Sequence, residues 1–84
     1  MKRIKLEDYN SSMGILIDVR SKKEFEKNPL DGCINIFADK LIMNHRNYLD
    51  KKNKYFIICE KGHSSKRVVG VLELYGYDVT QVIH

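Results

Sequence analysis

Short, nearly continuous apolar runs constrain the fold of this chain more than any other feature of its sequence. They occupy residues 15–19, 33–36, 55–59 and 79–83, and residues 3–6 fit a short opening strand. Strands whose apolar residues do not alternate with polar ones are typical of sheets covered on both faces, as parallel sheets are. The sequence therefore predicts a small parallel-type sheet of four to five strands.

The segments between these runs have the features of helices. Ser21, with Glu24 three residues later, has the pattern of a capping box, and the helix that it opens must end before Pro29. Residues 38–49 and 64–75 each repeat apolar side chains close to the helical period. Because strands and helices alternate, we expect an α/β fold with helices on both faces of the sheet.

The length of the chain allows one domain. Its 84 residues lie below the usual size at which chains divide, so we expect a single domain over residues 1–84. Hydrophobic residues make up 43% of the chain, which is too apolar for a disordered protein. No apolar run approaches the ~20 residues that span a bilayer, so no membrane association is expected.

Charge and cysteine content narrow the expected partners and setting. The net charge is +4, but basic residues are interleaved with acidic ones. The densest basic cluster, Lys51, Lys52 and Lys54, lies at an expected helix end, where cations complement the helix dipole, so we expect no nucleic-acid partner. Only Cys33 and Cys59 are present, without metal-site spacing, which favours a cytoplasmic location and no bound metal.

Cys59 is the first candidate for chemistry, because it lies at the expected carboxyl end of a strand, one short loop before a helix. Ligand sites of open parallel sheets lie at this edge, and the free N–H groups of a helix N-terminus favour thiolate over thiol. Gly62 lets the loop curl, and Ser64 or Ser65 is a candidate helix cap. A nucleophile in an anion-binding loop and a buried residue in an ordinary turn both remain open.

Asp18 and Arg20 lie at the carboxyl end of another predicted strand and form the second candidate group. Side chains two residues apart on a strand point the same way, so this acid and base are expected to pair and to brace the neighbouring loops. A purely structural ion pair and a guanidinium beside an anion pocket are both compatible with the sequence.

Four segments stand out when the chain is considered as a whole. They are IDVRS followed by EF within residues 17–25, DGCINI at residues 31–36, CEKGHSS at residues 59–65 and LYGYDV at residues 74–79. In order and spacing, these segments resemble the motifs of rhodanese-like domains, and residues 59–65 resemble the active-site loop of that family. The resemblance implies a rhodanese-like fold over nearly the whole chain.

The resemblance also implies a sulfurtransferase that uses no cofactor. Cys59 would be the catalytic residue, taking sulfane sulfur from thiosulfate or a persulfide donor and passing it, as a persulfide, to a thiol or protein acceptor. Asp18 and Arg20 would support the site. The loop that holds the persulfide and the anionic donor would comprise Glu60, Lys61, Gly62, His63, Ser64 and Ser65.

Two other functions are alternatives to this one. The first is a catalytically weak rhodanese-like regulatory or protein-interaction module, which the negative charge of Glu60 beside Cys59 favours. The second is a phosphatase, whose loop in this fold carries an arginine six residues after the cysteine. Here that position is Ser65, and the basic residues follow at Lys66 and Arg67. Phosphoryl transfer calls for an arginine clamp, so the sequence disfavours a phosphatase.

Overall fold

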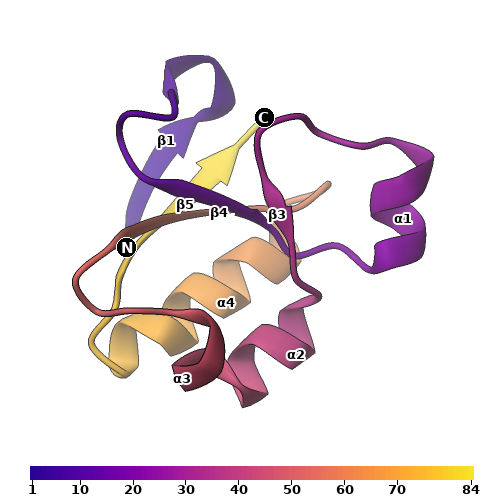
Figure 1. The fold of residues 1–84 in the computed structure, drawn as a ribbon. Coiled ribbons are helices and arrows are strands. Elements are labelled where there is room, and N and C mark those ends of the chain that lie inside the picture. Colours follow the sequence, from indigo (N-terminus) through magenta and orange to yellow (C-terminus); the bar gives the residue numbers. More distant parts are fainter.

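A computed structural model, which describes residues 1–84, contains a five-stranded sheet in the order β1-β5-β4-β2-β3 (Figure 1). Every neighbouring pair of strands is parallel. The predicted α/β fold and its parallel sheet are therefore confirmed. The strands are β1 (Lys2–Lys5), β2 (Ile15–Asp18), β3 (Ile34–Asn35), β4 (Lys54–Ile58) and β5 (Asp78–Ile83).

Helices cover the two faces of the sheet unevenly. Figure 1 shows α2, α3 and α4 together on one side, with α1 set apart beside β3. On the opposite face, the short 3₁₀ helix η1 and two loops supply the cover, through Leu6, Tyr9, Met13 and Leu30. The helical elements are η1 (Leu6–Asp8), α1 (Lys22–Lys27), α2 (Ala38–Met43), α3 (His45–Tyr48) and α4 (His63–Leu74). None of them is long and apolar enough to cross a bilayer.

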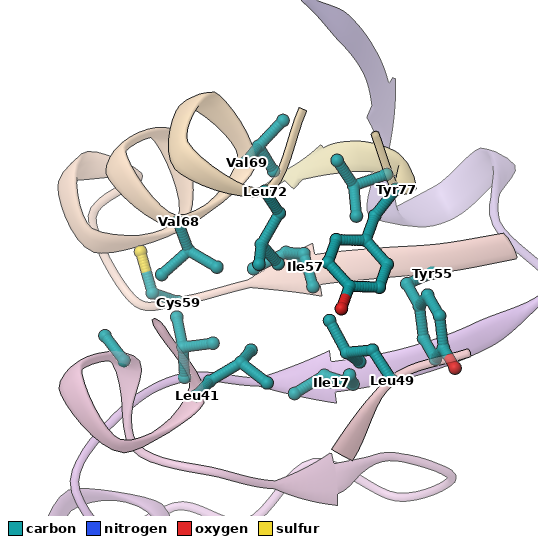
Figure 2. Packing of buried hydrophobic residues seen from close by; sticks show 13 residues of the cluster. Ile17, Leu41, Leu49, Tyr55, Ile57, Cys59, Val68, Val69, Leu72 and Tyr77 are labelled. Carbon is teal, nitrogen blue, oxygen red and sulfur yellow. The ribbon is translucent and has the colours of Figure 1, made fainter. Parts of the chain in front are cut away.

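The apolar runs are continuous because the central strands are buried on both faces. Ile17 and Ile57 point toward α4 and belong to a cluster of 13 buried residues (Figure 2). Leu16 and Phe56 point the other way, into a smaller cluster under η1. Successive side chains of a strand alternate between faces, so both clusters draw on the same short runs.

Two helix predictions had different outcomes. The capping box at the start of α1 is confirmed, because the Ser21 hydroxyl accepts a hydrogen bond from the Glu24 backbone N–H. The single helix predicted over residues 38–49 is wrong: the chain breaks at Asn44 into α2 and α3. The side chain of Asn44 donates to the carbonyl of Lys40 at 3.0 Å, the kind of local bond that competes with helix continuation.

The carboxyl ends of β2 and β4 lie side by side in the middle of the sheet. Asp18 at the end of β2 is paired in register with Ile58 at the end of β4. From β2 the chain moves outward to β3, and from β4 it moves the other way to β5. The sheet therefore has its topological switch point between β2 and β4, where α/β folds commonly form their ligand sites.

Candidate active site

The sulfur of Cys59 lies directly beyond the end of β4 and accepts two backbone hydrogen bonds. The N–H groups of Gly62 and Ser65 each lie 3.2 Å from Sγ, and the Ser65 hydroxyl lies 3.3 Å away. Figure 2 shows Cys59 at the margin of the larger apolar cluster, with its sulfur pointing toward α4. Converging N–H groups and the positive end of the helix dipole favour an anion at this sulfur.

Gly62 makes this loop geometry possible. Its φ of +86° lies in the left-handed region that other residues rarely adopt, and it immediately precedes α4. The predicted capping of α4 by Ser64 or Ser65 is wrong, because Gly62 holds the N-cap position without a side-chain cap. The Ser65 side chain instead lies inside the loop, with Oγ 3.2 Å from the Gly62 carbonyl oxygen and close to Sγ of Cys59.

The other loop residues form the rim of a pocket that reaches the cysteine. Lys61 and His63 are exposed and Ser64 is half-buried, and all three line a hollow of about 300 Å³ that Cys59 and Arg20 also line. Glu60 is exposed between Cys59 and this rim. The structure thus brings the predicted loop residues together, with a lysine, a histidine and a glutamate at the entrance.

Asp18 and Arg20 form the predicted ion pair, which is largely buried. Arg20 Nη2 lies 2.7 Å from Asp18 Oδ2, and Nε lies within 3.1 Å of both carboxylate oxygens. Hydrogen bonding to Asp18 raises the pKa of Arg20, so its guanidinium stays charged. The same Nη2 donates to the carbonyl of Asn28, which braces the loop after α1. Both side chains line a second pocket of about 200 Å³ that also reaches Cys59.

Three further residues at this edge were not predicted from the sequence. The Gln81 amide, on β5, donates to the Gly62 carbonyl at 2.9 Å and to Ser65 Oγ at 3.1 Å. His84 Nε2 lies 2.8 Å from the carbonyl oxygen of Cys59. The Asn35 amide donates to the carbonyls of Asp18 and Arg20, around the end of β2. Gln81 and Asn35, each a polar residue inside an apolar run, were visible signals, whereas His84 gave none.

Cys33 lies in a different environment, and we expect it to react more slowly than a free cysteine. Its thiol donates to the carbonyl of Leu30 at 3.0 Å. Burial, followed by the negative charge of Asp18, raises the pKa of Cys33 above its ordinary value of 9.0. A raised pKa leaves less reactive thiolate at a given pH.

Timed alkylation with iodoacetamide, followed by peptide mapping, measures this difference. At neutral pH, labelling of Cys33 should be at least severalfold slower than that of a free cysteine, and its rate should still be rising with pH above 9.0, where that of a free cysteine levels off. Labelling of Cys33 at the rate of a free cysteine would contradict the assignment.

A parallel α/β domain with a cysteine cradled by backbone N–H groups at its switch point defines a class of proteins with a cysteine loop at the carboxyl edge of the sheet. The sequence profile of the rhodanese-like domain matches residues 2–84. The chain therefore belongs to the rhodanese-like domain family, as its motifs indicated.

Comparison with individual proteins agrees with this assignment. A rhodanese-related protein of Thermoplasma volcanium superposes with a TM-score of 0.86 at 26% identity, covering 98% of this chain and 83% of that one. A rhodanese-like domain protein of Staphylococcus aureus gives a TM-score of 0.80 at 29% identity, covering 98% and 84%.

A curated relative is much longer than this chain. It is the adenylyltransferase and sulfurtransferase UBA4 of Meyerozyma guilliermondii, which is 32% identical over 75 residues. The matched region covers 77% of this chain but only 18% of the relative. The similarity thus concerns one part of that protein.

Proposed function

We propose that this domain is a sulfurtransferase that carries sulfane sulfur as a persulfide on Cys59. The observation that carries the proposal is the sulfur of Cys59 facing two backbone N–H donors at 3.2 Å, at the amino end of α4. Membership of the rhodanese-like family supports it, as does the similarity to a protein named as a sulfurtransferase. A reducing compartment such as the cytoplasm would keep Cys59 free for each cycle.

The first half-reaction would load the cysteine. The Cys59 thiolate attacks the outer sulfur of thiosulfate, a new S–S bond forms, and the bond within thiosulfate breaks. Sulfite leaves with the electron pair of the broken bond, and Cys59 becomes a persulfide. The terminal sulfur is then the anionic atom, and the backbone N–H groups of the loop would stabilise it.

The second half-reaction would remove the terminal sulfur from Cys59. A thiophilic acceptor, such as cyanide in an assay or a thiol of a small molecule or protein, attacks the terminal sulfur. The S–S bond of the persulfide breaks, and the electron pair returns to Cys59 as thiolate. Two displacements through one covalent intermediate make the cycle complete without a cofactor.

Charged side chains around the pocket would affect the binding of an anionic sulfur donor. Arg20 is neutralised by Asp18, but its Nη1 has no hydrogen-bond partner within the chain and could donate to the donor. Lys61 and His63 on the rim would add positive potential, and Glu60 would oppose it. These opposing charges partly cancel, so we expect only weak electrostatic attraction of an anionic donor.

The test is a thiosulfate–cyanide assay in which both substrates are varied and thiocyanate is measured. Double displacement predicts parallel lines in double-reciprocal plots, because sulfite leaves before the acceptor binds. Intersecting lines would indicate a ternary complex and would exclude the persulfide mechanism. An aryl phosphate in the same buffer is the counter-substrate, and we expect no hydrolysis, since Arg67 pairs with Asp39 rather than facing Cys59.

The alternative function is a rhodanese-like regulatory or protein-interaction module with little turnover. The observation in its favour is Glu60, which follows Cys59 in the sequence and lines both pockets that reach it. Thiocyanate formation by the wild type and by a Glu60 variant distinguishes the two functions. Glu60→Gln should increase thiosulfate turnover of an enzyme, whereas a module would form little or no thiocyanate with either residue.

A further inference from the structure

Gln81 is a buried polar residue in the middle of an otherwise apolar strand. Its relative exposure is 4%, and it points to the same face of the sheet as Val79, two residues earlier on β5. That face is covered by α4. Burying an amide is costly unless its hydrogen bonds are satisfied, so its partners are informative.

The partners of Gln81 fix the orientation of its amide. Arg3 Nε on β1 lies 3.1 Å from Oε1, and Arg3 is the register partner of Gln81 in the β1–β5 pair. A guanidinium can only donate, so Oε1 faces Arg3 and Nε2 faces the cysteine loop. From there, Nε2 reaches the Gly62 carbonyl at 2.9 Å and Ser65 Oγ at 3.1 Å.

The Gly62 carbonyl oxygen has more donors than it can accept. The backbone N–H of Lys66 donates to it at 3.1 Å, as the first turn of α4 requires. Nε2 of Gln81 is the second donor, and the Ser65 hydroxyl, at 3.2 Å, is the third. A carbonyl oxygen has two lone pairs, so Lys66 and Gln81 together saturate it.

Ser65 has one hydroxyl proton and two acceptors within reach. In the structure this proton goes to the Gly62 carbonyl oxygen at 3.2 Å, and the Cys59 thiol donates to Oγ at 3.3 Å. A Cys59 thiolate has no proton to donate, so its sulfur is then the second acceptor. With the carbonyl saturated, the proton is free to turn toward the sulfur. The amide of Gln81 also donates to Ser65 Oγ, which polarises the hydroxyl and strengthens its outgoing bond.

We propose that Gln81 is a positioning residue, which directs the Ser65 hydroxyl to the sulfur of Cys59 and so gives the anionic sulfur a third hydrogen-bond donor. The inference rests on the proposed function, in which Cys59 is the nucleophile. Arg3 acts indirectly: its hydrogen bond to Oε1 holds the Gln81 amide so that Nε2 faces the cysteine loop.

The test measures the state of Cys59 without any sulfur donor. The ultraviolet absorbance of the thiolate and the rate of alkylation by iodoacetamide are recorded at one fixed, near-neutral pH, in a Cys33→Ser background. Gln81→Met keeps the length of the side chain but removes both N–H donors. We expect the alkylation rate to fall about tenfold, the effect of one hydrogen bond to a charged group, together with a fall in thiolate absorbance.

A double-mutant cycle separates positioning from structural damage. In a Ser65→Ala background there is no hydroxyl to direct, so Gln81→Met should cause no further loss of reactivity. An equal loss in both backgrounds, or no loss in either, would overturn the proposal. Val79→Ala is the stability control: it opens a cavity on the same face of β5 and should lower thermal stability without changing the alkylation rate.

The other charged groups near Cys59 are the same in all these variants. They are the Asp18–Arg20 pair, Glu60, Lys61, His63 on the loop and rim, and His84 at the end of β5. Because alkylation needs no thiosulfate, the result does not depend on turnover. Absence of thiocyanate formation would therefore count against the proposed function alone, and an unchanged Gln81→Met variant would count against positioning alone.

Discussion

Replacement of Cys59 by serine should abolish thiocyanate formation from thiosulfate and cyanide, lowering kcat/KM by at least about a thousandfold. A serine hydroxyl cannot form the persulfide, and the loop offers no second sulfur within hydrogen-bond distance of the Gly62 and Ser65 N–H groups. The loss should occur without unfolding, since a serine oxygen can accept the same two N–H bonds. Thermal unfolding followed by circular dichroism checks that point.

Cys33→Ser is the matched control for this variant. Cys33 bonds to the carbonyl of Leu30 and does not line either pocket that reaches Cys59. We expect its replacement to leave turnover within a factor of about two, the range of an ordinary surface or half-buried change. If Cys33→Ser lost activity while Cys59→Ser kept it, the nucleophile would be misassigned.

Asp18→Ala should strongly destabilise the domain. Asp18 is 1% exposed, and its carboxylate accepts four hydrogen bonds from the backbone and side chain of Arg20. Removal leaves a guanidinium whose side chain is only 10% exposed without its partner. Breaking a buried pair in this way costs about 3 kcal/mol, or about 12–24 °C in Tm for a domain of this size.

Two further variants test this explanation by urea or thermal unfolding. Asp39→Ala breaks the exposed pair with Arg67 and should cost less than about 1 kcal/mol. The double variant Asp18→Ala/Arg20→Met should recover part of the lost stability, because no unpaired charge remains. A loss for Asp18→Ala no greater than that for Asp39→Ala would show that the pair is not a structural brace.

The fold was predictable because its signals are local. The apolar runs at residues 15–19 and 55–59 are continuous because both faces of the sheet are covered, and that pattern predicted parallel strands. The break at Asn44 was not predictable from apolar periodicity. It depends on one side-chain hydrogen bond to Lys40, which has no effect on the spacing of apolar residues.

The loop around Cys59 was predictable for a similar reason. A cysteine at a strand end, a glycine and a following helix lie together in the sequence, and the structure places the N–H groups of Gly62 and Ser65 at the sulfur. The contributions of Gln81 and Arg3 depend on the β1–β5 register, which joins the two ends of the chain. No local sequence pattern predicts that register, so the roles of these two residues could be found only from the three-dimensional structure.

The same locality explains the error at the start of α4. Serine is a favoured N-cap residue, and Ser64 and Ser65 stand at the right distance from the strand. Gly62 takes the N-cap position with a positive φ, and Ser65 lies inside the loop, with its hydroxyl beside the sulfur. The capping prediction for Ser65 was thus wrong, while its predicted place in the loop around Cys59 agrees with the structure.

The most direct test of the central claim is the intact mass of the reduced protein after incubation with thiosulfate and removal of the excess. A low-molecular-weight persulfide serves as the second donor, and Cys59→Ser and Cys33→Ser are measured in parallel. We predict a gain of one sulfur atom in the wild type and in Cys33→Ser, none in Cys59→Ser, and reversal by cyanide. A gain that persists in Cys59→Ser, or no gain with either donor, would contradict the assignment of Cys59 as the sulfur carrier.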